Sequence, residues 1–215
     1  MKVAILGSGD VAQQLGRGFA KHGHDVMIGS REPQSEKLQK WKKEVGGKGS
    51  TGSSADAAKF GEIVVLATVG RGTESAIDAA GAKNFDGKLV IDVTNPLDFS
   101  KGMPPGLYVG TTDSLGEKVQ RKIPKAKVVK CFNTVSNLQM IDPKHKGEKP
   151  RMMIAGDDAN AKKELETMLK DLGWGGAIDT GGIVMARWLE ALVPLWVSVA
   201  GSEKTFDIIF QPTKP

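Results

Sequence analysis

Short apolar runs alternate with amphipathic stretches along almost the whole chain. The apolar runs predict β-strands at 2–6, 25–30, 62–69, 88–95, 127–133, 151–157 and 174–181. The stretches between them predict helices over 11–22, 31–45, 73–83, 113–122 and 158–173, with an apolar helix from 183. Because strand–helix units repeat, we expect an α/β fold of the Rossmann type: a doubly wound, mainly parallel sheet with a packed C-terminal helix.

Individual residues refine several of these boundaries. Pro33 is expected in the first turn of the helix over 31–45, where its missing N–H is tolerated. Asp158 and Gly173 are the expected N-cap and C-cap of the helix between them. The Gly/Ser-rich segment 46–58 is interpreted as a loop holding a brief strand, with a helix starting near Ser54.

Length and composition favour one compact unit. The 215 residues, 40% of them hydrophobic, can bury a full core, so we expect a single domain over 1–215 whose helical extension covers about 183–215. The net charge of +5 favours anionic ligands without requiring nucleic acid, and no nucleic-acid partner is expected. With Cys131 as the single cysteine and only three histidines, neither a disulfide framework nor a metal site is expected.

The chain carries no clear targeting signal. Met1 leads straight into the strand-like KVAIL, so we expect a cytoplasmic protein. The longest apolar stretch, 183–201, is interrupted by Arg187, Glu190 and Pro194. We therefore interpret it as a buried or dimer-forming helix and expect no membrane partner.

A glycine-rich turn follows the first strand and opens the first helix. Its residues match the G-x-G-x-x-G/A pattern: Gly7-Ser8-Gly9-Asp10-Val11-Ala12. The first glycine permits the tight turn, the second lets the backbone approach a pyrophosphate, and the alanine allows close packing of helix on strand. The start of the helix adds free N–H groups and a partial positive charge, so we predict a dinucleotide site. Asp10 has to point aside or it weakens the site, because its carboxylate would repel the phosphates.

The end of the second strand indicates which dinucleotide binds. An NAD site carries an acidic residue here for the ribose 2′-hydroxyl, but this chain has Ser30-Arg31. A hydroxyl and a guanidinium suit a 2′-phosphate, which favours NADP(H) over NAD(H). Lys37 would add positive charge, although its lysine-rich segment also fits a solvated helix face.

The later strand ends supply the remaining candidate contacts, because open α/β sheets bind ligands at the carboxyl ends of their strands. Small hydroxyl and amide residues there suit a ribose and the nicotinamide carboxamide, although turns use the same residue types. The candidates are Ala67, Thr68, Val69, Thr94, Asn95, Pro96, Asn133, Thr134 and Val135.

The usual acid–base groups of dehydrogenases are not recognisable. Tyr108, the only tyrosine, is followed four residues later by Thr112 and not by lysine. We therefore expect no catalytic side chain and a hydride transfer that depends on the alignment of two redox molecules, since cofactors carry the difficult chemistry.

The sequence resembles the family of F420-dependent NADP oxidoreductases, which is related to the oxidoreductase domains of six-transmembrane metalloreductases. The resemblance spans nearly the whole chain. The segments that carry it are KVAILGSGDVAQQLGRGFAKHGHDVMIGSR, EIVVLAT, the D-x-T-N-P turn, FNT, IAGDD and DTGGIVMARWLEALVPL.

The resemblance implies a homodimer that passes hydride between NADP(H) and coenzyme F420, a deazaflavin. It implies that Ser8, Ser30 and Arg31 hold the NADP phosphates and that Thr68, Val69, Asn95 and Pro96 lie near the nicotinamide. It places the acceptor near Asn133, Val135 and Gly181-Gly182.

Two departures from the family pattern fall in the acceptor region. His-Thr-Ile-Pro of the archaeal members is Asn133-Thr134-Val135-Ser136 here, and their Gly-Pro before the last helix is Gly181-Gly182. The resemblance therefore supports NADP(H) more firmly than F420. A flavin, a quinone or a ferric chelate stays open as acceptor, as does a non-catalytic NADP(H)-binding sensor.

Overall fold

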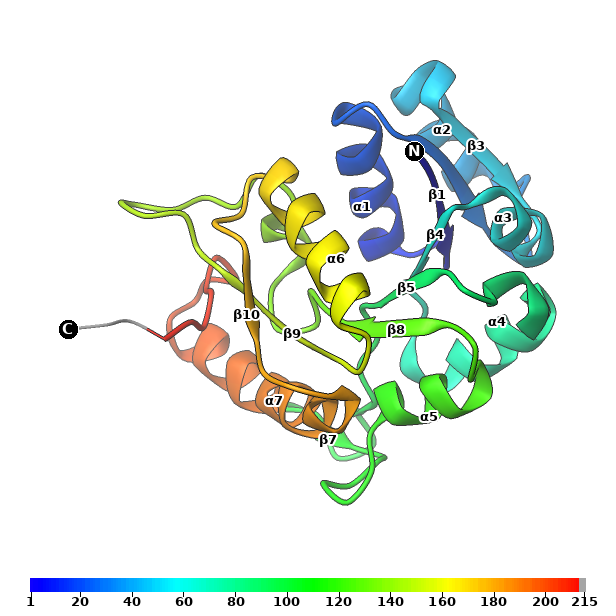
Figure 1. The fold of residues 1–215 in the computed structure, drawn as a ribbon. Helices are drawn as coiled ribbons and strands as arrows, with labels where there is room; N and C mark the ends of the chain where they lie inside the picture. Colours follow the sequence, from blue (N-terminus) through cyan, green and yellow to red (C-terminus); the bar gives the residue numbers. More distant parts are fainter. Residues whose placement is uncertain (213–215) are drawn as a thin grey trace.

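The computed structural model describes residues 1–212, which fold around an eight-stranded sheet (Figure 1). The sheet order is β10-β9-β8-β5-β4-β1-β2-β3. Its strands are β1 (Lys2–Leu6), β2 (Asp25–Gly29), β3 (Gly49–Gly52), β4 (Ile63–Leu66), β5 (Leu89–Asp92), β8 (Lys127–Lys130), β9 (Met152–Gly156) and β10 (Ala177–Asp179). The helices are α1 (Asp10–Lys21), α2 (Glu36–Val45), α3 (Ser54–Phe60), α4 (Thr73–Ala80), α5 (Leu115–Lys122), α6 (Ala159–Asp171) and α7 (Ala186–Ser202). The predicted fold class is confirmed.

The direction of the strands decides which loops share an edge. All neighbours from β3 to β8 pair in parallel, so their carboxyl ends lie along one edge of the sheet. The strand order reverses between β1 and β4, which is where ligands bind in folds of this kind. β9 pairs antiparallel with β8, and β10 pairs in parallel with β9. The ends of β9 and β10 therefore face away from that edge.

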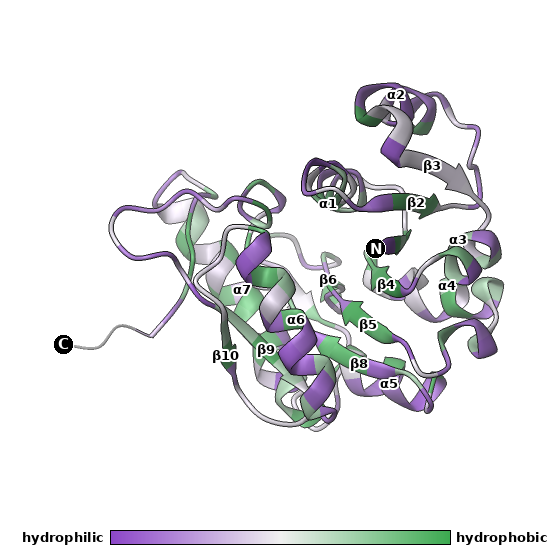
Figure 2. Ribbon diagram, turned by 45° about the horizontal axis from the view of Figure 1, so that its top comes forward, coloured by the Kyte–Doolittle hydropathy of each residue, from purple (hydrophilic) through white to green (hydrophobic). Residues whose placement is uncertain are grey.

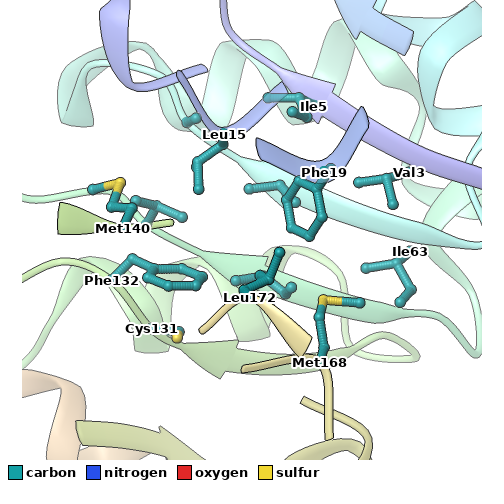
Figure 3. Packing of buried hydrophobic residues seen from close by; sticks show 14 of the residues in the cluster. Val3, Ile5, Leu15, Phe19, Ile63, Cys131, Phe132, Met140, Met168 and Leu172 are labelled. Carbon is teal, nitrogen blue, oxygen red and sulfur yellow. The ribbon is translucent and has the colours of Figure 1, made fainter. Parts of the chain in front are cut away.

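Helices cover both faces of the sheet, because successive strand side chains point to opposite sides. Val3 and Ile5 pack with Leu15 and Phe19 of α1 and with Met168 of α6 (Figure 3). A second cluster contains residues of α3, α4 and α5 on the other face, together with the beginning of α7. The central strands are correspondingly apolar, whereas the edge strand β3 is not and the helices carry polar residues on their outer sides (Figure 2).

Several predicted elements are shorter than expected. The strands predicted at 62–69, 88–95 and 127–133 end at Leu66, Asp92 and Lys130. Asp158 caps α6 as predicted, with its Oδ1 accepting from the N–H of Ala161 at 2.8 Å. The C-cap is Leu172 instead of Gly173, which follows it with φ +93°.

The predicted helix over 31–45 begins five residues too early. α2 starts at Glu36, so Pro33 lies in the preceding turn and not in the helix. The N–H of Glu32 donates to Ser30 Oγ at 3.1 Å, and the N–H of Ser35 donates to the carbonyl of Glu32. These bonds close a turn of their own, and Arg31 therefore lies in a loop at the end of β2.

A small hairpin, which the sequence reading missed, follows β5. Its strands are β6 (Leu97–Asp98) and β7 (Gly106–Leu107). Their two-residue length gave no recognisable alternation. Tyr108, which follows the hairpin, contacts the turn after β4: its ring lies 4.4 Å from the guanidinium carbon of Arg71.

The C-terminal helix corrects one sequence argument. Within residues 1–212, the segment Ile183–Ser202 is one helical stretch long and apolar enough to cross a membrane by length and composition. Its charged residues therefore do not exclude a span on that criterion. In the fold they are paired: Arg187 with Glu117 of α5, and Glu190 with Lys130 of β8. Leu189, Val193 and Trp196 are buried. Cytoplasmic localisation stays a prediction.

Candidate functional site

The glycine turn after β1 has the geometry of a phosphate-binding loop. Gly7 has φ +128°, and a Cβ there would overlap the carbonyl of Ala67, so only glycine fits. A Cβ at Gly9 would meet no atom within 4 Å. Gly9 is also the N-cap of α1, and no side chain caps the helix. The first-turn N–H groups are thus left for an anion. Asp10 is exposed in that turn.

The end of β2 lies next to this loop, because the N–H of Gly7 donates to the carbonyl of Gly29 at 3.0 Å. Ser30 Oγ accepts from the N–H of Glu32, which fixes the turn. Arg31 and Lys37 are exposed, and neither forms an ion pair within residues 1–212. The structure thus places two positively charged side chains without ion-pair partners near the carboxyl end of β2, beside the glycine turn.

The end of β4 faces the same edge. Ala67 is almost buried, and the hydroxyl of Thr68 lies 2.9 Å from that of Thr73. The side chain of Val69 is 81% exposed, which is unusual for valine. The turn after β4 therefore presents the apolar side chain of Val69 next to the hydroxyls of Thr68 and Thr73.

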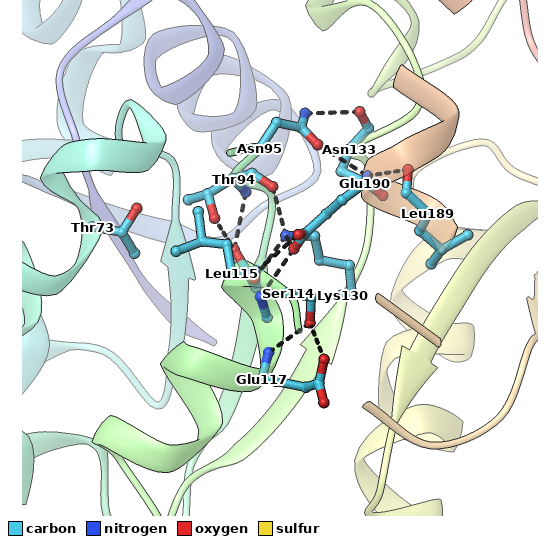
Figure 4. Close-up of polar contacts among 12 residues, drawn as sticks. Thr73, Thr94, Asn95, Ser114, Leu115, Glu117, Lys130, Asn133, Leu189 and Glu190 are labelled. Carbon is cyan, nitrogen blue, oxygen red and sulfur yellow. Dashed lines mark hydrogen bonds and ion pairs between the residues drawn. The ribbon is translucent and has the colours of Figure 1, made fainter. Parts of the chain in front are cut away.

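The ends of β5 and β8 are joined by two asparagines (Figure 4). Asn95 Nδ2 donates to the carbonyl of Asn133 at 3.0 Å, and Asn133 Nδ2 donates to Asn95 Oδ1 at 3.1 Å. Asn133 Nδ2 also donates to the carbonyl of Leu189 in α7 at 2.9 Å. Asn133 is only 4% exposed, yet its Oδ1 has no partner among the described residues. A buried acceptor without a donor is costly, and a ligand N–H would satisfy it.

Four further candidates are mostly enclosed by the protein. The N–H and hydroxyl of Thr94 both donate to Asp92 Oδ1, at 3.0 and 2.6 Å, and Thr94 is 2% exposed. The Thr94 hydroxyl therefore braces the turn. Thr134 and Val135 are likewise buried. Pro96 is buried beside Asn95.

A buried group of charges lies below the asparagine pair (Figure 4). Lys130 Nζ lies 2.9 Å from Asp92 Oδ2, 2.7 Å from Glu190 Oε1 and 2.6 Å from the carbonyl oxygen of Thr94. Lys130 and Asp92 are fully buried, and Glu190 is 2% exposed. Burial acts to lower the pKa of Lys130, but the two carboxylates more than offset it, so that the pKa is raised and the amine is charged.

Gly181 and Gly182 follow β10. The N–H of Gly156 donates to the carbonyl of Gly181, and Gly156 pairs with Val129 of β8, to which β9 runs antiparallel. That the two glycines lie near the acceptor stays a prediction.

Comparison with known proteins decides the family. The sequence model described as "NADP oxidoreductase coenzyme F420-dependent" matches residues 2–96, which contain β1 to β5 and their carboxyl-end turns. The F420-dependent NADP reductase of Methanocaldococcus jannaschii is 30% identical over 208 residues, covering 93% of this chain and 92% of that protein. The chain belongs to the family of F420-dependent NADP oxidoreductases.

A solved structure and a longer relative also match this chain over all or most of its length. A crystal structure from Arthrobacter sp. FB24, described as a candidate F420-dependent NADP reductase, superposes with a TM-score of 0.94 at 41% identity over 100% of both chains. The metalloreductase STEAP3 of Rattus norvegicus is 28% identical over 91% of this chain, which spans 38% of that protein. The predicted family and its relation to metalloreductases are confirmed.

Sequence reasoning assigned no role to the buried charges. Lys130 and Asp92 each interrupt an apolar strand, in VVKCF and LVIDV, and Glu190 interrupts the apolar helix. A charged residue inside an apolar run is the available signal, because such a residue is rarely buried without a partner. The sequence does not show that these three residues meet.

Proposed function

We propose that this chain is an oxidoreductase that transfers hydride between NADP(H) and coenzyme F420. The observation that carries the proposal is Arg31, exposed and without an ion pair in the described chain, beside a glycine turn that leaves the first N–H groups of α1 uncapped. The names of its relatives in archaea support F420 as the acceptor. When bound, NADPH would supply a hydride from nicotinamide C4 to C5 of the deazaflavin, leaving NADP⁺, and one proton from solvent would complete the reduced deazaflavin.

The chain's own residues bind and orient the dinucleotide. The N–H groups of Ser8, Gly9, Asp10 and Val11 hold the pyrophosphate at the start of α1. Ser30 and Arg31 hold the 2′-phosphate by charge-assisted hydrogen bonds, and Lys37 adds attraction from α2. The net charge of +5 suits both this cofactor and an anionic deazaflavin.

The ends of β4, β5 and β8 orient the two redox rings. Ala67, Thr68 and Val69 form one wall, and the exposed valine side chain excludes water from the nicotinamide. Asn95 and Pro96 form the floor with Thr94 beneath them. Asn133, with Thr134 and Val135, borders the acceptor, and its unpartnered Oδ1 accepts a ligand N–H.

We further propose that residues 1–215 work as one NADP-binding domain in a homodimer. The predicted extension from about 183 to 215 is helical as far as Ser202, and its residues 213–215 lie outside the described chain. Val184, Trp188 and Leu195 of this extension are exposed at 45%, 55% and 55%. Spacings of four and seven residues put them on one side of the helix. A second copy that packs on this stripe would cover these three side chains.

An acceptor screen tests the proposed reaction. Purified protein is mixed with NADPH and, in separate reactions, with F420, FMN, FAD, a quinone and a ferric chelate, and NADH replaces NADPH as the matched control. Loss of the F420 absorbance with NADPH but not with NADH is the expected result. Turnover with another acceptor and none with F420 would reject F420 and agree with the metalloreductase relative. Tight NADPH binding without turnover would identify a sensor.

A further inference from the structure

A cluster of three buried charged residues connects the turns that carry Asn95 and Asn133 to α7 (Figure 4). We propose that Lys130, together with Asp92 and Glu190, is a positioning group that sets the geometry of hydride transfer. It touches neither redox ring and acts through the turn Thr94–Pro96 and through α7. This inference rests on the function proposed above.

Lys130 has all its hydrogen-bonding capacity committed. Its three N–H groups match three acceptors: Asp92 Oδ2, Glu190 Oε1 and the Thr94 carbonyl oxygen. The third contact is made to the peptide that precedes Asn95. Asp92 Oδ1 holds the same turn from the other side through the N–H and hydroxyl of Thr94. The two residues together fix the backbone on which Asn95 and Pro96 stand.

Glu190 connects the cluster to two helices. Its Oε2 accepts from the N–H of Leu115 and its Oε1 from that of Gly116, each at 2.9 Å, at the start of α5. The preceding residue in α7, Leu189, offers its carbonyl to Asn133 Nδ2. One turn of α7 therefore holds both Lys130 and Asn133, and a shift of α7 would move the asparagine pair.

Stability gives a poor reason for such a cluster. Removing charges from water is costly, and well-packed apolar residues of similar volume often replace buried ion pairs without loss. The neighbouring residues of β5 and β8 are apolar: Val90, Ile91, Val128 and Val129 are buried. A positioning role accounts for the charged residues, because directional hydrogen bonds hold the turn Thr94–Pro96 and α7 in one position. Apolar packing alone would allow several positions.

The test separates geometry from stability with paired variants. Lys130→Met leaves two buried carboxylates and should fold poorly. Asp92→Asn/Lys130→Met removes one positive and one negative charge together. The amide oxygen introduced by Asp92→Asn can still accept from Thr94, but the Thr94 carbonyl loses its donor. Asp158→Ala is the matched control, because it removes the remote cap of α6 and does not touch the cluster.

Single-turnover hydride transfer from NADPH to F420 is measured per NADPH-binding site, along with the NADPH Kd and the Tm. For the double variant we expect a Tm closer to wild type than that of Lys130→Met, a Kd within about threefold of wild type, and transfer about 10- to 100-fold slower. Asp158→Ala should lower the Tm and leave the transfer rate unchanged. A double variant that transfers hydride at the wild-type rate would overturn the proposal, as would a rate that follows the Tm across all variants.

Two further measurements keep the result decisive. Should the double variant not fold, Asp92→Asn alone replaces it: slower transfer at unchanged Kd supports the proposal, and an unchanged rate overturns it. The fluorescence emission of bound NADPH is recorded without any acceptor. The positioning role requires this emission to differ between wild type and variant when both are equally saturated with NADPH. A wild type that is inactive with F420 would reject the proposed function, while this emission comparison would still decide the role of Lys130.

Discussion

A side chain on Gly7 would overlap the main-chain carbonyl of Ala67, where the end of β1 meets the end of β4. Gly7 also has φ +128°, a conformation that side chains of L-residues rarely adopt. Two residues further along, Gly9 has φ −77° and open space where a Cβ would stand. The two glycines of the motif therefore serve different purposes, one in the fold and one at the ligand.

Alanine substitutions should separate these purposes. Gly7→Ala should destabilise the protein by more than about 1 kcal/mol, because of backbone strain and the clash with Ala67. Gly9→Ala should change the stability by about 1 kcal/mol or less but weaken NADPH binding about tenfold or more, because its methyl group would occupy the place of the pyrophosphate. Chemical denaturation and NADPH titration measure the two effects. Equal NADPH affinity of Gly9→Ala and wild type would contradict a phosphate at this loop.

Arg31→Ala tests the choice of cofactor. The guanidinium has no ion pair in the described chain, so its removal should leave the fold intact. We expect the affinity for NADP(H) to fall by about 1.5–3 kcal/mol, the range for a hydrogen bond to a charged group, with little change for NAD(H). Isothermal titration with both cofactors measures the difference, and Lys37→Ala is the comparison variant with a smaller expected loss. Equal losses for the two cofactors would refute a 2′-phosphate at Arg31.

The local sequence was sufficient to predict most of the sheet and the glycine turn that follows β1. The glycine turn, the loops after β4 and β5, and the cap at Asp158 depend on contacts between residues close in sequence or on strand order. Such features are recognisable because each has a short-range physical cause: a turn that only glycine allows, or an apolar run that ends in polar residues.

The features that were missed depend on long-range pairing. β9 runs antiparallel to β8, and no residue within 151–157 indicates that direction. Glu190 meets Lys130 across 60 positions of sequence. The start of α2 was misplaced because Ser30 and Glu32 form a local turn that competes with the helix.

Val69→Ser should affect the ligand and not the fold. Because the side chain is 81% exposed, we expect a change in unfolding free energy within about 0.5 kcal/mol. If the nicotinamide packs against this valine, losing its methyl groups should weaken NADPH binding by roughly 1 kcal/mol. Fluorescence titration and thermal denaturation test the two parts. Stability loss without any change in NADPH affinity would mean that Val69 packs within the protein and does not form a wall of the site.

Trp188→Glu should dissociate the proposed homodimer. The indole is 55% exposed on the same side of α7 as Leu195, and a buried carboxylate in an apolar interface is costly. Sedimentation should change from dimer to monomer, and Leu195→Glu should act in the same direction. Thr167→Glu, an exposed position on α6 that introduces the same charge, is the matched control and should leave the assembly unchanged. A wild type that sediments as a monomer would contradict the dimer itself.

Glu117 and Arg187 give the stability a defined dependence on pH. Two hydrogen bonds from Arg187, at 2.6 and 2.8 Å, hold the pKa of Glu117 below its usual range. Because the folded-state pKa is the lower one, the pair stabilises the fold above the unfolded pKa of about 4.3, and this contribution is lost as the pH falls through the folded pKa. Glu117→Gln should therefore be less stable than wild type by up to about 1 kcal/mol at neutral pH, with a gap that closes below about pH 4. Ile77→Val removes a methyl group from the buried core and should cost about 1 kcal/mol at every pH in urea denaturation. A Glu117→Gln gap that stays as constant as the Ile77→Val gap would show that the ion pair contributes nothing through its charge.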